Sequence, residues 1–280
     1  MIWMGSHKST LIAIGGGDLA SSSSLLKLLK DRIERRKCRR MVIMTVATEE
    51  PTAAARKYQR LFKQLGVKET RSIDIGTRDD GFDEKAIEAM QEADAMYFTG
   101  GDQLNITSLM GGTPVHEVLR RKWKEGTLIA GSSAGAAMMS GSMIISGESD
   151  SPPRSGGVEI APGVNLLDGV LVDTHFSERG RHGRLLTAVA HYPQLIGVGI
   201  DTNTAAIFTN GSFRVAGEGV VTVMDGSQMH HCDLPNREKD ETVGLFGVRI
   251  HVLPAGYSFE IETREPHFNK ALVNRKAVSG

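Results

Sequence analysis

Residues 128–136 read Leu-Ile-Ala-Gly-Ser-Ser-Ala-Gly-Ala. The apolar run from Leu128 to Ala130 is typical of a short buried strand, and the small residues that follow suit the start of a closely packed helix. With Ser133 at its centre, the stretch also fits the pattern G-x-S-x-G, in which flanking glycines allow a strained turn that exposes a serine hydroxyl. The same pattern also occurs in strand-to-helix turns without a catalytic serine. Other residues of the chain are therefore needed to tell whether Ser133 is a nucleophile.

Upstream of this stretch, strand patterns alternate with helix patterns. Strands are expected at residues 11–14, 41–44, 71–75 and 95–98, and helices at 25–33, 51–65, 83–93, 104–110 and 114–125. This alternation predicts a parallel sheet covered by helices on both faces. Right-handed crossovers would bring the loops at Gly15, Gly100 and Ser133 to one carboxyl edge, where open α/β sheets bind ligands.

Downstream, the pattern changes. Residues 147–162 are rich in Gly, Ser, Pro and charge and are expected to form a long loop at the active edge, and from residue 196 strand patterns dominate. The fold class predicted is a three-layer α/β/α sandwich with a mostly parallel sheet and a β-rich C-terminal flank. We expect residues 11–280 to form a single domain and residues 1–10 to be disordered or left over from cloning.

Gly15, Gly16 and Gly17 follow the first expected strand. They lack the G-x-G-x-x-G spacing of a dinucleotide site and the Lys-Ser/Thr of a P-loop. They therefore predict a tight turn with close backbone approach rather than a nucleotide site.

The charge balance, the cysteines and the lack of long apolar runs argue against several classes of function. The chain has 280 residues, and its 33 basic and 33 acidic residues cancel, so no overall field attracts nucleic acid or an anionic membrane. Cys38 and Cys232 lie far apart without metal-ligand spacing, which argues against a disulfide framework or a zinc site. No run of 18 apolar residues and no signal-peptide pattern is present. We expect a cytoplasmic protein that acts on small molecules or peptides, without a metal.

His175 is the histidine best placed to activate Ser133, because it follows a buried strand whose end would lie at the same edge. On its own, a histidine there more often simply ends a strand. Arg179, Arg181 and Arg184 follow within nine residues, and guanidinium groups bind carboxylates through paired hydrogen bonds. The three nearby arginines therefore favour the interpretation that His175 is a base that acts on an anionic substrate.

Four segments in matching order resemble the cyanophycinases of the S51 serine peptidases: residues 99–103, 131–136, 173–181 and 199–205. The likeness extends from about residue 11 to residue 254. It implies a class I glutamine-amidotransferase-like fold and hydrolysis of cyanophycin, a poly-aspartate that carries arginine on each β-carboxyl, to β-aspartyl-arginine dipeptides. It also implies a cytosolic exopeptidase that needs no metal or cofactor and is often a homodimer.

By position, the resemblance makes Ser133 the nucleophile and His175 its base. The amides of Gly101 and Ala134 are expected to form the oxyanion hole. The residues expected to bind substrate are Gln103, Asp173, Thr174, Arg179, Arg181 and Arg184.

Two positions depart from the family pattern. Thr174 stands where the family has glutamine, which shortens or removes one polar contact to the substrate. Thr202 stands where the family has the glutamate of the triad; threonine carries no negative charge, although its hydroxyl can accept a hydrogen bond from the ring. Asp201 is a candidate substitute acid, but neighbours on a strand point to opposite faces, so it would need a bulge or a turn.

Three interpretations of Thr202 stay open: Asp201 or another carboxylate substitutes, a Ser-His pair suffices at a reduced rate, or the protein has lost hydrolysis. The function predicted is a serine exopeptidase that hydrolyses cyanophycin through an acyl-enzyme. The alternatives are a weakened or inactive paralogue that binds acidic or arginyl peptides, and a relative that cleaves aspartyl dipeptides.

Overall fold

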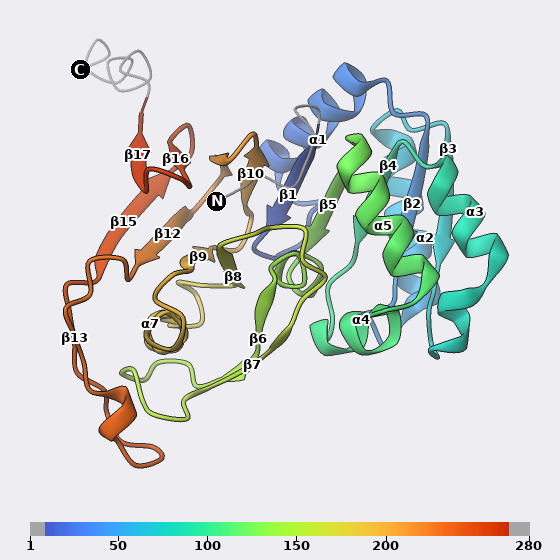
Figure 1. Ribbon diagram of the computed structural model, residues 1–280. Helices are drawn as coiled ribbons and strands as arrows, with labels where there is room; N and C mark the ends of the chain where they lie inside the picture. The colour runs from blue at the N-terminus through green and yellow to red at the C-terminus, as the bar shows by residue number, and fades with distance from the viewer. Residues whose placement is uncertain (1–8, 269–280) are drawn as a thin grey trace, which may run out of the picture.

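The computed structural model describes residues 9–268 (Figure 1). Its helices are α1 (Ser23–Arg36), α2 (Pro51–Gln64), α3 (Glu84–Glu92), α4 (Gln103–Met110), α5 (Pro114–Glu125), α6 (Ala134–Ala137) and α7 (His182–His191), with 3-10 turns at Asp79–Phe82 and Leu234–Asn236. The first nine strands are β1 (Thr10–Ile14), β2 (Arg40–Met44), β3 (Glu69–Ile73), β4 (Ala95–Phe98), β5 (Leu128–Ser132), β6 (Ser142–Gly147), β7 (Val158–Pro162), β8 (Val170–Thr174) and β9 (Ile196–Ile200). The remaining strands are β10 (Thr204–Thr209), β11 (Ser212–Gly217), β12 (Val220–Asp225), β13 (His231–Cys232), β14 (Leu245–Phe246), β15 (Arg249–Pro254), β16 (Ser258–Glu260) and β17 (Glu265–His267).

The main sheet has the strand order β17-β16-β11-β10-β1-β5-β4-β2-β3. Strands β1, β5, β4, β2 and β3 are parallel, as the alternation of strand and helix patterns predicted, and β10, β11, β16 and β17 extend the sheet antiparallel. The hairpin between β10 and β11 turns at Asn210 and Gly211, both with positive φ, which is the turn that an Asn-Gly pair favours. The mixed α/β fold and its β-rich C-terminal flank are thus confirmed.

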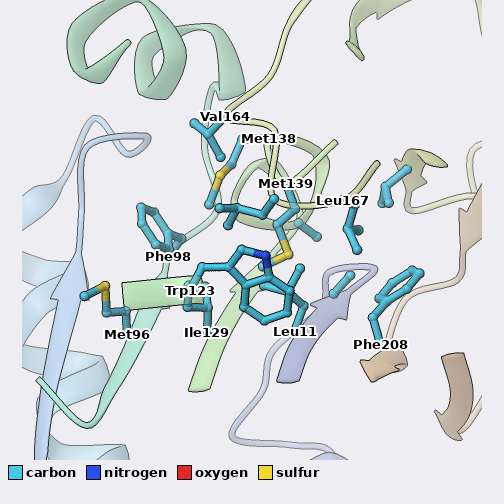
Figure 2. Close-up of a cluster of buried hydrophobic side chains, with 14 of the residues drawn as sticks. Leu11, Met96, Phe98, Trp123, Ile129, Met138, Met139, Val164, Leu167 and Phe208 are labelled. Atoms are coloured by element: carbon cyan, nitrogen blue, oxygen red, sulfur yellow. The ribbon is translucent and has the colours of Figure 1, made fainter. Parts of the chain in front are cut away.

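Helices cover both faces of the parallel strands because the strands bury side chains on both sides. On one face, Ile12 and Tyr97 cluster with Leu29 of α1 and Phe62 of α2. On the other face, the strands pack against α3 and α5, and Figure 2 shows Trp123 of α5 among Leu11, Met96 and Ile129. The sheet therefore lies between two helical layers.

A second sheet, with the order β15-β12-β9-β8, was not expected from the sequence. Strands β8 and β9 are parallel, as in a strand-helix-strand unit, but they do not join the main sheet, because β9 pairs with β12 on its other side. The strand that precedes His175 therefore belongs to a different sheet from the strand that precedes Ser133. The two sheets bring their loops together at one edge.

Two expectations need correction. Residues 147–162 do not form one long loop, because β7 pairs antiparallel with β6, with Ile144 opposite Ile160. Ser9 and Thr10 are not disordered: both are buried, Thr10 begins β1, and the Ser9 hydroxyl donates to the Trp123 carbonyl at 2.7 Å. The rest of the expected disordered start, residues 1–8, lies outside the described residues, as do residues 269–280. Within residues 9–268, no helix is both long and apolar enough to cross a membrane.

Candidate active site

Ser133 lies on a strained turn between β5 and α6. Its φ of 54° and ψ of −114° are unfavourable for a residue with a Cβ atom. The flanking glycines are required by close backbone contacts: a Cβ on Gly131 would lie 2.1 Å from the Gly135 carbonyl oxygen, and one on Gly135 would lie 2.4 Å from the Phe98 carbonyl oxygen. This is the geometry of a nucleophile elbow, in which the strain exposes the serine hydroxyl.

The last residue of β1 and the glycine loop that follows it connect three parts of the site through their carbonyl groups. The Ile14 carbonyl accepts from the Ser133 amide at 2.9 Å, the Gly15 carbonyl from the His175 amide at 2.7 Å, and the Gly16 carbonyl from the Asn203 amide at 3.0 Å. The glycine turn predicted from the sequence is therefore the segment that aligns the elbow with the loops after β8 and β9.

His175 joins the serine to Thr202. Its Nε2 lies 3.1 Å from the Ser133 hydroxyl oxygen, and its Nδ1 lies 3.1 Å from the Thr202 hydroxyl oxygen. The ring also rests against Gly16, where an added Cβ would lie 2.1 Å from the ring carbon Cε1. The structure thus places the His175 ring between the hydroxyl groups of Ser133 and Thr202.

Asp201 is turned away from this chain. Its carboxylate oxygens accept hydrogen bonds from the main-chain amides of Ser177 and Val220, each at 3.0 Å. Since Thr202 and Ser133 occupy the two ring nitrogens of His175, Asp201 does not replace the acid of a triad. The hydrogen-bond chain at the serine contains no carboxylate.

Burial and nearby cations keep His175 uncharged. Loss of solvent around the ring is the largest cause; together with the positive charges of Arg179 and Arg181 it lowers the pKa of His175 to about 4, although the charge of Asp173 opposes the shift. At neutral pH the imidazole is therefore unprotonated. It is ready to accept a proton from Ser133.

Asp173 and Arg184, both expected to bind substrate, are buried against each other. The Arg184 guanidinium donates to both carboxylate oxygens, with Nε at 2.8 Å from Oδ2. The Thr174 amide also donates to Asp173, at 2.8 Å, and an Arg181 nitrogen lies 3.5 Å away. These charges compensate one another beneath the turn that carries His175, so the pair holds that turn.

The other expected substrate residues differ in exposure. The side-chain amide nitrogen of Gln103 donates hydrogen bonds to the carbonyls of Ile144 and Ile145, at 2.8 and 3.3 Å. Arg181 is half-buried and donates to the Thr174 carbonyl at 2.5 Å, whereas Arg179 is exposed. Of the three arginines, Arg179 is the one whose guanidinium is open to a ligand.

The amides of Gly101 and Ala134, expected to form the oxyanion hole, lie on the two segments that meet at Ser133. Gly100 approaches Ser133 so closely that an added Cβ would lie 3.3 Å from the serine Cβ. Within residues 9–268, neither the Gly101 amide nor the Ala134 amide has a hydrogen-bond acceptor. Both remain available to an oxygen that develops negative charge.

Two residues at the site were not singled out in the sequence. Gly16 was seen only as part of a turn, and Glu178, whose Oε1 accepts from the Thr202 amide at 2.9 Å, was seen only as part of a family segment. The three consecutive glycines were a usable signal for a close contact. Nothing in the sequence indicated which residue Glu178 would meet.

A serine on a strained turn that is hydrogen-bonded to an uncharged histidine is the arrangement of a hydrolase with a serine nucleophile. Comparison with protein families agrees with this class. The model described as "Peptidase family S51" matches residues 10–216. The chain belongs to peptidase family S51, and it is a serine peptidase.

Curated relatives cover nearly the whole chain. A cyanophycinase of Trichormus variabilis is 33% identical over 260 residues, which are 92% of this chain and 87% of the relative. A cyanophycinase of Thermosynechococcus vestitus is 33% identical over 262 residues, 92% of this chain and 81% of the relative. A cyanophycinase of Geminocystis herdmanii is 34% identical over 228 residues, 81% of this chain and 84% of the relative.

Solved structures show the same fold at lower identity. A peptidase from an acI-B1 Actinobacterium superposes with a TM-score of 0.66 at 21% identity, covering 92% of this chain and 100% of that chain. A putative peptidase E from Listeria monocytogenes superposes with a TM-score of 0.53 at 15% identity, covering 75% of this chain and 99% of that chain.

Proposed function

We propose that this peptidase hydrolyses cyanophycin to β-aspartyl-arginine dipeptides through an acyl-enzyme on Ser133. The observation that carries the proposal is the 3.1 Å contact between His175 Nε2 and the Ser133 hydroxyl at the elbow. The substrate class comes from the relatives named cyanophycinase, which are about one-third identical over 81–92% of this chain. A cytoplasmic location and a homodimer stay predictions.

The proposed reaction uses the hydrogen-bond chain in both directions. Ser133 Oγ attacks the scissile carbonyl carbon while His175 Nε2 takes its proton, and the amides of Gly101 and Ala134 donate to the resulting oxyanion. His175 then gives the proton to the leaving amine as the C–N bond breaks. A water molecule, deprotonated by the same ring, attacks the acyl carbon, and the ring returns that proton to Ser133 Oγ as the acyl C–O bond breaks. Throughout, the Thr202 hydroxyl accepts from Nδ1–H and fixes the tautomer.

The proposal for substrate binding changes with the structure. Arg179 is proposed to contact a substrate carboxylate, because its guanidinium is exposed beside His175. Asp173 and Arg184 are proposed to act indirectly, since their buried ion pair supports the turn between His175 and α7. Gln103 is proposed to act in the same indirect way through β6.

One observation favours a second candidate, a binding protein that has lost hydrolysis: the chain Ser133-His175-Thr202 lacks a carboxylate. Loss of the orienting acid costs about 10⁴ in kcat in a well-studied serine protease. Such a protein would bind acidic or arginyl peptides without cleaving them.

Product analysis separates these candidates. The purified protein is incubated with cyanophycin and, separately, with free aspartyl dipeptides, and products are identified by mass spectrometry. We expect β-aspartyl-arginine from the polymer, and none from a folded Ser133→Ala variant. Saturable binding without release would support the binding protein, whereas cleavage of the short peptides alone would support a dipeptidase.

A further inference from the structure

The hydrogen-bond chain that starts at Ser133 ends on a hydroxyl, and a carboxylate lies one contact beyond it. The main-chain amide of Thr202 donates to Glu178 Oε1 at 2.9 Å. Glu178 lies on the turn between β8 and α7, three residues after His175, whereas Thr202 follows β9. The contact therefore joins the loop of the base to the loop of the base's acceptor.

Thr202 is held by its peptide groups. The Thr204 hydroxyl donates to the Thr202 carbonyl at 3.2 Å, and the next amide, that of Asn203, donates to the Gly16 carbonyl at 3.0 Å. Of these contacts, the one from Glu178 is the contact made by a charged group. It also comes from the loop that carries His175, so it fixes the two loops relative to each other.

We propose that Glu178 is a positioning residue for the peptidase reaction. Its carboxylate holds Thr202 so that the hydroxyl meets Nδ1 of His175, and its negative charge lies two hydrogen bonds from the ring that becomes an imidazolium. The inference rests on the proposed acyl-enzyme mechanism but not on the identity of the substrate.

The charges around the His175 ring show why the position of Thr202 matters. Arg179 and Arg181 disfavour a positive charge on His175, and the opposing carboxylate of Asp173 is already bonded to the Arg184 guanidinium. Within residues 9–268, Glu178 forms no ion pair with lysine or arginine. No ion pair therefore draws its carboxylate away from the Thr202 amide. Because the two arginines disfavour the imidazolium, the alignment of the Thr202 hydroxyl with Nδ1 matters when the ring takes the serine proton.

The experiment measures two rates for the full-length protein. One is the second-order rate at which a fluorophosphonate labels Ser133 at pH 7, and the other is turnover of cyanophycin. Glu178→Ala should lower the labelling rate and kcat about tenfold or more, with KM unchanged, because the lost contact acts on the transition state. Glu178→Gln should lower the labelling rate and kcat less, because the amide oxygen of glutamine still accepts from the Thr202 amide. It also keeps the test valid if the alanine variant does not fold.

A double-mutant cycle tests the route through Thr202. In Thr202→Val there is no hydroxyl to position, so adding Glu178→Gln should lower neither rate further. The pKa of His175 is about 4, chiefly because the ring is buried, and neither substitution adds a negative charge near it. Every variant therefore has an unprotonated ring at pH 7, and a slower reaction there does not arise from protonation of the base.

Glu241 provides the matched control. It is also an exposed glutamate whose Oε2 accepts one main-chain amide, that of Glu238, at 3.0 Å. Glu241→Ala should leave labelling and turnover unchanged.

Three results would overturn the inference: labelling within twofold of the wild-type rate in both Glu178 variants, an equal fall in the Thr202→Val background, or a raised KM at constant kcat. Absence of Ser133 labelling in the wild type would also overturn it. If the wild type releases no dipeptide from cyanophycin while labelling still depends on Glu178, the proposed substrate is wrong and the inference stands.

Discussion

The two sides of the site are built differently. The Ser133 side depends mainly on six consecutive residues, 131–136, whose glycines meet one another and the end of β4. The His175 side depends on Gly16, Thr202 and Glu178, which come from three separate loops. The comparison shows that the nucleophile is shaped by local sequence, whereas the orientation of its base is a property of the tertiary structure.

This difference also separates two kinds of damage. Substitutions at the elbow glycines would disrupt buried backbone contacts, so they should lower stability as well as activity. Changes at Thr202 and Glu178, which are partly or fully exposed beside the half-buried ring, should lower the rate with little loss of stability, whereas Gly16 is buried.

The largest effect on the His175 side is expected from Gly16→Ala. The new methyl group would lie 2.1 Å from the ring carbon Cε1, so the imidazole must move away from Ser133. A displacement of this kind costs about 10²-fold in kcat or more. The measurement is turnover of the substrate, with thermal unfolding as the check on folding.

Gly66→Ala is the matched control for backbone strain. Gly66 has a φ of +100°, close to the +115° of Gly16, but no atom lies within 4 Å of its added Cβ. The substitution should cost about 1 to 2 kcal/mol of unfolding free energy and leave kcat unchanged. Equal losses of kcat in both variants would show that strain, and not contact with His175, controls activity.

A smaller effect is expected from Arg179→Gln. Removal of this cation raises the pKa of His175 above about 4. Since the base works only when unprotonated, the acid limb of kcat/KM should move to higher pH, by about half a pH unit or less because the Arg179 side chain is exposed and screened. The pH profile from pH 3 to 8 measures it.

Arg121→Gln, which removes an exposed arginine paired with Glu125 on α5, should leave the acid limb in place. A limb that moves to lower pH in Arg179→Gln would contradict the electrostatic account of His175. A change in KM alone would assign Arg179 to substrate binding without an effect on the base.

Much of the fold could be predicted because apolar periodicity is local. The parallel strands β1, β2, β4 and β5 and their helices appear where the pattern placed them. The second sheet could not be predicted, because β8 and β9 carry the same strand signal whether β9 pairs with β12 or the two strands join the main sheet. The β6–β7 pairing was hidden by the Gly, Ser and Pro residues between the two strands.

The site divides in the same way. Ser133 and His175 could be placed from motifs, and a hydrogen bond from the ring to Thr202 was one of the possibilities foreseen. The burial of Asp173 against Arg184 was not foreseen, because a sequence motif does not distinguish an arginine that meets substrate from one that meets a neighbouring carboxylate. Glu178 depends on a contact across 24 residues that no local pattern encodes.

The most direct test of the central claim is to map the site of fluorophosphonate labelling by peptide mass spectrometry, in the wild type and in His175→Ala. The account predicts one adduct, on Ser133, in the wild type at neutral pH, and a rate slower by about 10³-fold or more in His175→Ala because the general base is lost. An adduct on another serine, or equal labelling of Ser133 in both proteins, would contradict it.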